Sequence, residues 1–249
     1  MIVNETQWHR ALPEECTLSN EVHVWRVFLD LDTLQTESLL GTLSADEVKR
    51  AGRFRFERDQ KRFITARGML RQILGCYLGT SPHKLRFEYT PLGKPMLAAN
   101  SGSDTLCFNM SHADAFAVYA ITRDRSIGID IERKSDDIAI KQIVQRFFSQ
   151  GEISSLERIH ENMRNEVFFQ YWTRKEAFLK ATGDGMSFPM EQFDVSLING
   201  RGWLPVTLMG DKRGSGRWYV QDLFPGHGYA AAIAVEGGQL NLSWWHYSA

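Results

Sequence analysis

Two acidic residues alternate with isoleucines in the middle of the chain. The segment 126–132 reads Ser-Ile-Gly-Ile-Asp-Ile-Glu, a period-two pattern typical of a strand with one buried face. Asp130 and Glu132 therefore share one face of this strand and lie roughly 7 Å apart along it. Two such carboxylates repel each other unless a cation or a shared proton lies between them. An exposed edge strand with two solvated acids is the simpler interpretation of these residues alone.

A third acid, next to a lysine, follows on a predicted helix. The segment 172–180 reads Trp-Thr-Arg-Lys-Glu-Ala-Phe-Leu-Lys, within an amphipathic pattern from about 165 to 182. Trp172, Glu176 and Lys180 recur every four residues and form one stripe along the helix. A glutamate and a lysine at this spacing are often only a surface pair. Together with Asp130 and Glu132, however, they would give three hard carboxylate ligands for a Mg²⁺ ion that also binds phosphate oxygens.

These two segments resemble the signature motifs of the Sfp-type 4′-phosphopantetheinyl transferases, and the resemblance extends from Ser44 to about Pro189. It implies an α+β fold of two similar lobes related by pseudo-two-fold symmetry, with the active site in the cleft between them. It also implies Mg²⁺-dependent (or Mn²⁺-dependent) transfer of the phosphopantetheine arm of coenzyme A to a serine of an acyl or peptidyl carrier protein. Adenosine 3′,5′-bisphosphate is the expected leaving group.

The resemblance assigns roles to the residues of both motifs. Asp130, Glu132 and Glu176 are the expected metal ligands. Lys180 is expected to stabilise the pyrophosphate, and Glu176 is also a candidate base for the incoming serine, directly or through water. Trp172 is expected to pack structurally.

Two motifs in the first half of the chain match the family's coenzyme A contacts. Phe108–His112 reads Phe-Asn-Met-Ser-His, which implies that Ser111 and His112 bind coenzyme A phosphates, with His112 a catalytic residue on the pyrophosphate. The turn Gly93-Lys94-Pro95 implies that Lys94 reaches the nucleotide. Without the resemblance, these residues are equally compatible with a structural role for His112 and with a solvent-exposed Lys94 in a turn.

Basic residues are dense between 50 and 71, along a region predicted to be helical. A capping box at Ser44–Glu47 predicts one helix start, and a second helix is expected from about 59 to 77. Most of these bases suit a solvated helix face, but guanidinium groups also bind phosphate in a bidentate way. The resemblance makes three of them candidates for the 3′-phosphate of coenzyme A: Arg53, Arg62 and Arg67. Glu47 stands where some members of the family have a lysine.

Composition excludes several other classes of protein. The net charge of −1 gives no electrostatic argument for binding nucleic acid or a membrane. The longest apolar run, 229–235, is too short to span a bilayer, and we see no signal peptide. Cys16, Cys76 and Cys107 are widely spaced, which argues against zinc and against a disulfide framework. These features predict a cytoplasmic protein in a reducing compartment.

A polar turn at 122–125 divides the chain into two predicted lobes, 1–123 with the nucleotide contacts and 124–249 with the metal site and signature helix. A cleft built within one chain predicts a monomer. Two other functions remain open at this point. One is a Mg²⁺-dependent phosphohydrolase that uses the same acids, and the other is a non-catalytic coenzyme A-binding protein.

Overall fold

The structure is a computed structural model, and it describes residues 9–10, 16–98, 105–135, 139–195, 202–210 and 217–247. Its α-helices are α1 (Thr33–Leu40), α2 (Ala45–Ala51), α3 (Glu57–Leu78), α4 (Ile140–Phe147), α5 (Gln150–Arg158) and α6 (Glu161–Thr182). Short 3₁₀ turns are η1 (Pro82–Lys84), η2 (Gly185–Ser187) and η3 (Met190–Gln192).

The strands gather into two main sheets and two small ribbons. The strands are β1 (His9–Arg10), β2 (Glu21–Phe28), β3 (Phe87–Tyr89), β4 (Pro95–Leu97), β5 (Leu106–Ala113), β6 (Phe116–Arg123), β7 (Ile127–Arg133), β8 (Phe193–Asp194), β9 (Leu204–Pro205), β10 (Thr207–Leu208), β11 (Trp218–Leu223), β12 (Tyr229–Glu236) and β13 (Asn241–Tyr247). One sheet has the order β1-β13-β2-β6-β5 and the other β7-β12-β11-β9, and the ribbons are β3-β4 and β10-β8.

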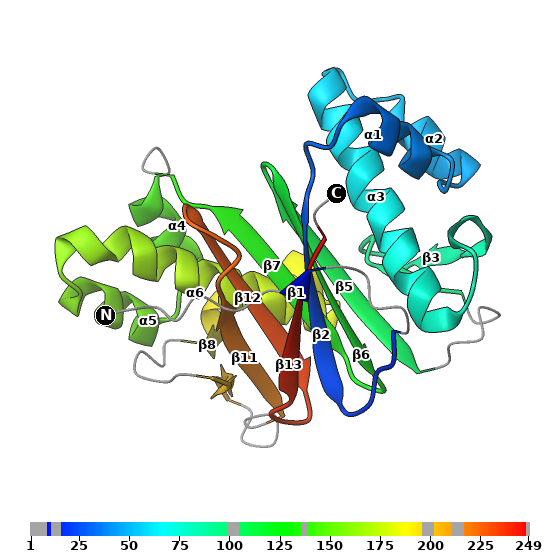
Figure 1. The fold of residues 1–249 in the computed structure, drawn as a ribbon. Coiled ribbons are helices and arrows are strands. Elements are labelled where there is room, and N and C mark those ends of the chain that lie inside the picture. Colours follow the sequence, from blue (N-terminus) through cyan, green and yellow to red (C-terminus); the bar gives the residue numbers. More distant parts are fainter. Residues whose placement is uncertain are drawn as a thin grey trace.

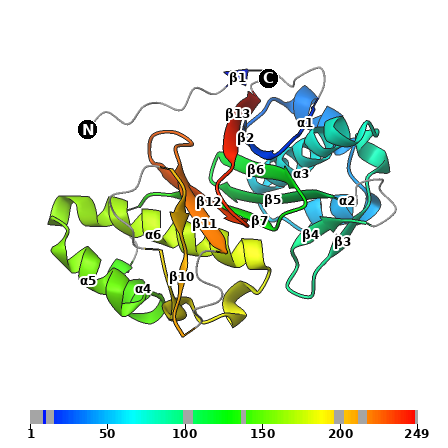
Figure 2. The same cartoon turned by 90° about the horizontal axis from the view of Figure 1, so that it is seen from below.

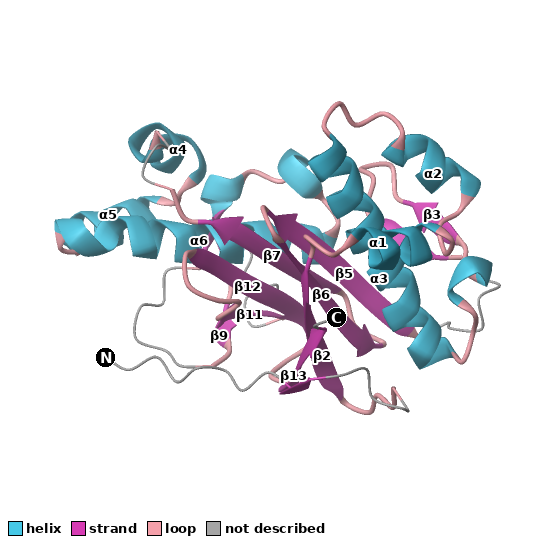
Figure 3. Cartoon of the chain, turned by 45° about the horizontal axis from the view of Figure 1, so that its top comes forward, coloured by secondary structure: helices cyan, strands magenta, loops and turns pink. Residues whose placement is uncertain are grey.

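Each main sheet has its own group of helices, as predicted for two α+β lobes. Figure 1 shows α1–α3 on one side of the central strands and α4–α6 on the other. The same separation is visible from below in Figure 2 and by secondary-structure type in Figure 3. The division does not follow chain order throughout, because β13 pairs in parallel with β2 and so belongs to the sheet of the N-terminal lobe.

Three apolar clusters hold this arrangement together. One packs α3 on the N-terminal sheet around Trp25, and a second packs α6 on the C-terminal sheet around Phe178. A third joins the two sheets, with Val24 of β2 and Ile129 of β7 among its buried members. Ile127, Ile129 and Ile131 all lie in this third cluster. The strand predicted here is confirmed and its isoleucines face the other sheet, but the prediction of a single buried face was wrong, because Gly128 and Asp130 on the opposite face are buried too.

Local signals set several helix boundaries, including the start predicted at Ser44. Ser44 and Ser149 are N-caps with complete capping boxes at the starts of α2 and α5. Gly79 and Gly183 end α3 and α6 in the left-handed conformation that favours glycine. The long helices begin earlier than predicted, at Glu57 and Glu161, because their first turns are polar and carry no apolar period.

The prediction against a disulfide was wrong. Cys16 and Cys76 form a disulfide across a sequence separation of 60 residues, with their Cα atoms 5.6 Å apart. It links the segment before β2 to the end of α3, and Cys16 is itself buried in the N-terminal core. Cysteine spacing gives no information about such a long-range pair. Separately, no helix among the described residues is long and apolar enough to cross a membrane.

Candidate active site

The site begins with the contact between α6 and β7, which depends on Gly128. A Cβ atom at this position would lie 2.0 Å from the carbonyl oxygen of Ala177 and 2.4 Å from the amide nitrogen of Ala181. Only glycine allows the two backbones to approach so closely. Because alternate residues share a face, Gly128, Asp130 and Glu132 all lie on the side of β7 opposite its buried isoleucines. The signature helix therefore rests directly on the strand that carries the acids.

Asp130 lies at the meeting point of three elements. Its carboxylate is buried, with 3% of the residue exposed. Its Oδ1 accepts hydrogen bonds from Lys180 Nζ of α6 at 2.6 Å and from Ser111 Oγ of β5 at 3.0 Å. Lys180 Nζ also donates to Ser111 Oγ at 2.9 Å. The structure thus brings together Ser111, Asp130 and Lys180, and it contradicts the interpretation of Asp130 as a solvated edge residue.

The negative charge of Asp130 acts on both Glu132 and Glu176. Burial raises the pKa of Glu176, and the charges of Asp130 and Glu132 raise it further, against the opposing effect of Lys180. Burial also raises the pKa of Glu132, with Asp130 adding to the rise. The Trp172 side chain acts in the opposite direction on the pKa of Glu132, so Trp172 lies beside this acid. The two glutamates are close enough to Asp130 to feel its charge.

The donor chemistry of this group fits Mg²⁺. Within the described residues, Asp130 Oδ2 is a buried oxygen with no hydrogen-bond partner. Hard carboxylate oxygens are the protein ligands that Mg²⁺ prefers, and a cation would relieve the mutual repulsion seen in the raised pKa values. No three Asp, Glu, His or Cys side chains in the described part of the chain already converge as a metal cage. The carboxylates would therefore have to close in on an ion to bind it.

Lys94 is held by backbone carbonyls of the C-terminal lobe. Its Nζ donates to the backbone carbonyls of Ile127, Lys180 and Ala181, with the first and last bonds at 3.2 and 3.3 Å. Burial lowers the pKa of Lys94 to about 8. The β3–β4 loop of one lobe is thus fastened to β7 and to the end of α6 in the other. The side chain also lines a cavity of about 260 Å³ with Glu176 and Lys180. Whether it also reaches the nucleotide stays a prediction.

His112 faces a second cavity, of about 230 Å³, that contains a basic residue absent from the predicted set. Arg50, Phe54, Arg67 and Tyr89 line this cavity with His112. Partial desolvation lowers the pKa of the imidazole, and the charges of Lys180 and Arg50 lower it further, although His112 is exposed overall. Arg50 was one of eight bases in its region, and sequence alone gave no reason to single it out. Aromatic walls beside two guanidinium groups suit a nucleotide.

The three predicted 3′-phosphate arginines occupy three different environments. Arg53 is exposed. Arg62 pairs with Asp30 at 2.6 Å and with Asp114 at 2.7 Å, so carboxylates already bind its guanidinium.

Arg67 has both protein partners and a place at the cavity. Its Nε atom is 3.0 Å from Oε1 of buried Glu47, and its guanidinium group lies over the rings of Phe87 and Tyr89. Of the three candidates, it is therefore the one that borders the cavity shared by His112 and Arg50.

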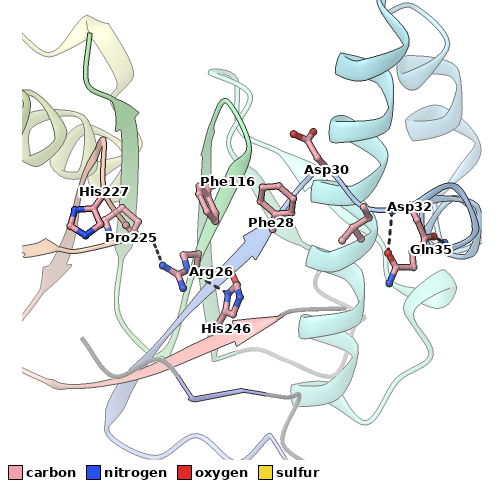
Figure 4. Close-up of a pocket in the computed structure, with 11 residues that line it drawn as sticks. Arg26, Phe28, Asp30, Asp32, Gln35, Phe116, Pro225, His227 and His246 are labelled. Atoms are coloured by element: carbon pink, nitrogen blue, oxygen red, sulfur yellow. Dashed lines mark hydrogen bonds between the residues drawn. The ribbon is translucent and has the colours of Figure 1, made fainter. Parts of the chain in front are cut away.

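A cavity of about 730 Å³ contains none of the predicted site residues. Figure 4 shows Phe28 and Phe116 in its centre, with Arg26 and His246 on one side and Asp32 on the other. Several of its polar groups are already engaged by protein. Arg26 donates to the carbonyl of Pro225 and to His246, and Asp32 caps α1. This hollow is a poor candidate for the chemistry.

Two lobes that meet at an acid-and-lysine site define a class of transferase, and comparisons with known proteins agree. Residues 126–234 match the 4′-phosphopantetheinyl transferase superfamily, and residues 33–123 match the 4′-phosphopantetheinyl transferase N-terminal family. The chain belongs to the 4′-phosphopantetheinyl transferase superfamily and is of the type that has this N-terminal domain.

Individual relatives extend the match over nearly the whole chain. It is 38% identical to 4′-phosphopantetheinyl transferase HetI of Nostoc sp. (strain PCC 7120) over 240 residues, which cover 96% of this chain and 98% of the relative. It is 30% identical over 176 residues to 4′-phosphopantetheinyl transferase ffp of Bacillus subtilis, covering 70% and 76% of the two chains. The human L-aminoadipate-semialdehyde dehydrogenase-phosphopantetheinyl transferase is 30% identical over 168 residues, covering 64% and 54%.

Proposed function

We propose that this transferase moves the 4′-phosphopantetheine arm of coenzyme A onto a serine of an acyl or peptidyl carrier protein. The observation that carries the proposal is the contact of Ser111, Asp130 and Lys180 across the seam of the lobes, beside two glutamates with raised pKa values. In the reaction the serine oxygen bonds to the β-phosphorus of coenzyme A. The bond from that phosphorus to the bridging oxygen breaks, and adenosine 3′,5′-bisphosphate leaves.

Asp130, Glu132 and Glu176 would hold Mg²⁺ or Mn²⁺. When bound, the ion supplies positive charge against the pyrophosphate oxygens. The Lys180 ammonium would leave Asp130 for a phosphate oxygen as the carboxylates turn to the ion. His112, beside Arg50, would contact the α-phosphate side of the leaving group. The serine proton would pass to Glu176, directly or through water.

The nucleotide is proposed to lie in the cavity of His112, Arg50 and Arg67, where its ring would stack on aromatic side chains and the 3′-phosphate would meet the guanidinium groups. A monomer in the cytoplasm remains the expected state. The Cys16–Cys76 disulfide, however, removes the argument from cysteine usage for a reducing compartment.

The test is to incubate the chain with coenzyme A, Mg²⁺ and an acyl carrier protein, and then to weigh the carrier by mass spectrometry. We expect the carrier to gain the mass of phosphopantetheine, and a metal chelator to prevent the gain. Degraded coenzyme A with an unmodified carrier would instead support the phosphohydrolase. Intact coenzyme A and an unmodified carrier would support the non-catalytic binding protein.

A further inference from the structure

A fully buried ion pair lies on the inner side of the signature helix, away from the proposed chemistry. Lys175 Nζ is 2.8 Å from Glu152 Oε2, and both side chains are 0% exposed. Lys175 directly precedes Glu176 in the sequence, and successive residues of a helix point about 100° apart around its axis. The signature motif thus has two working faces, one toward the cleft and one toward the core of the C-terminal lobe.

Every polar atom of this pair is engaged. Lys175 Nζ also donates to the carbonyls of Met190 at 2.7 Å and Phe193 at 2.9 Å. Glu152 accepts from the amides of Ser149 at 2.8 Å and Val195 at 2.9 Å. The pair therefore ties α6 to the start of α5 and to the segment that contains η3 and β8. Desolvation lowers the pKa of Lys175 and raises that of Glu152, so each charge depends on its partner.

On the opposite side of α6, close packing against β7 leaves the helix little room to move. At Gly128 the helix meets β7 through backbone atoms, and a shift toward the strand is blocked at Ala177 and Ala181. The position of Glu176 along and around the helix axis is therefore fixed from the inner side, where Lys175 is anchored.

We propose that Glu152 and Lys175 are positioning residues that fix the Glu176 carboxylate in the proposed metal site. The inference rests on the proposed function, because Glu176 has no other assigned task. Neither residue contacts Asp130 or Glu132 by any hydrogen bond or ion pair in the described part of the chain. Glu152 lies outside both signature motifs, so sequence comparison with those motifs does not reveal the role.

The test compares Lys175→Met, Glu152→Gln and the double variant of both with two controls. Val220→Ala, in the same buried core, serves as a control for lost stability alone. Glu47→Gln breaks the matching buried pair of the N-terminal lobe, where Glu47 lies 2.6 Å from Arg71. The readouts are the melting temperature, Mn²⁺ binding by calorimetry without coenzyme A, kcat and KM for coenzyme A, and hydrogen exchange of the 170–182 amides.

We expect Lys175→Met to lower both Mn²⁺ affinity and kcat about 10-fold to 100-fold, as for residues that orient metal ligands, with KM for coenzyme A unchanged. The double variant, which buries no unpaired charge, is expected to recover melting temperature but not Mn²⁺ affinity. Val220→Ala and Glu47→Gln should leave Mn²⁺ affinity as in the wild type. If Lys175→Met does not fold, Glu152→Gln and the double variant provide the same comparison.

The proposal is overturned if the Glu152 and Lys175 variants lose melting temperature like Val220→Ala but keep wild-type Mn²⁺ affinity and kcat. Failure of the proposed function would look different, because the wild-type chain itself would then transfer nothing to a carrier. In that case hydrogen exchange still decides the positioning role. Exchange across 170–182 should be faster in Lys175→Met than in Val220→Ala, and equal exchange would refute it.

Discussion

The two lobes bury the same kind of ion pair beside their long helices, but with different net charges. In each lobe the third residue of a capped short helix is a buried glutamate: Glu47 in α2 and Glu152 in α5. Glu47 pairs with Arg71 of α3, and Glu152 pairs with Lys175 of α6. In the N-terminal lobe, however, Glu47 also faces Arg67. That cluster carries one surplus positive charge, whereas the pair in the C-terminal lobe is neutral.

The agreement extends to the segments that follow the two helices. Arg71 donates to the carbonyls of Pro82 and Leu85, just as Lys175 donates to those of Met190 and Phe193. This correspondence supports the pseudo-two-fold relation between the lobes. Under the proposed function, this difference in charge would let similar halves take unlike ligands. The N-terminal lobe would offer guanidinium groups to a phosphate, and the C-terminal lobe would offer carboxylates to a cation.

The largest expected effect is that of removing a carboxylate from the C-terminal lobe. Asp130→Asn should raise the barrier to transfer by about 5 kcal/mol, because it removes a charge from the metal site and a partner from Lys180. The measurement is single-turnover transfer of labelled pantetheine. Asp222→Asn, an acid on β11 that pairs with Arg174, is the matched control and should retain transfer. Near-normal turnover in Asp130→Asn would end the metal-site proposal.

Removing the disulfide should lower the stability of the N-terminal lobe, which contains both cysteines. Reduction, or Cys16→Ser with Cys76→Ser, is expected to cost roughly 4 kcal/mol, from the chain entropy of a 60-residue loop. Urea unfolding followed by tryptophan fluorescence measures the loss, and Cys107→Ser is the control because Cys107 is a free thiol. Three reactive thiols in the unreduced, urea-unfolded chain would show that the bond is absent.

Filling the contact between α6 and β7 should harm the C-terminal lobe. Gly128→Ala is expected to cost about 3 kcal/mol of folding free energy, because its Cβ would overlap backbone that cannot move aside. Transfer should fall with it, as Glu176 is pushed away from β7. Gly52→Ala is the control, since a Cβ there would lie 3.7 Å from its nearest neighbours. Equal melting temperatures for the two variants would contradict this account.

The N-terminal lobe should respond through substrate binding. Arg50→Ala is expected to weaken coenzyme A binding by about 2 kcal/mol, the value of a charged hydrogen bond, and to raise KM more than it lowers kcat. Arg55→Ala, an exposed arginine nearby, is the control. If Arg50 binds the 3′-phosphate, its loss should have little effect on binding of dephospho-coenzyme A. An equal loss with both substrates would place Arg50 elsewhere on the nucleotide.

The smallest effect concerns pH. The pKa values of Glu132 and Glu176 are raised in the folded chain, so their contribution to stability falls as pH rises from the unfolded pKa through the folded one. Above that range both are charged and repel Asp130, and a cation offsets the repulsion. Mg²⁺ should therefore stabilise the protein more at pH 8 than at pH 5, by about 1 kcal/mol. Thermal melts with and without Mg²⁺ measure the difference, and Glu132→Gln with Glu176→Gln should abolish it.

Local patterns predicted the elements well, because their causes are local. The isoleucines of β7 and the capping box at Ser44 depend on neighbours within a few residues, and both were found where expected. The two signature motifs likewise led to Asp130 and Lys180, which the structure joins directly.

What sequence did not reveal depends on distant segments. Cys16 meets Cys76, and Ser111 donates a hydrogen bond to Asp130. Lys94 binds carbonyls of the other lobe, which no turn motif encodes. Arg50 stood out only once folding had placed it beside His112. Each of these contacts joins residues that are far apart in the sequence. A sequence motif identifies the residue type but not such a distant partner.

The place of β13 bears on the order in which the molecule is completed during synthesis. Residues 241–247 lie between β1 and β2 in the sheet of the N-terminal lobe. While the ribosome is still making the chain, that sheet has a gap that nothing translated so far can fill. The sheet of the half that is made first is therefore complete only after the last strand of the second half has been made.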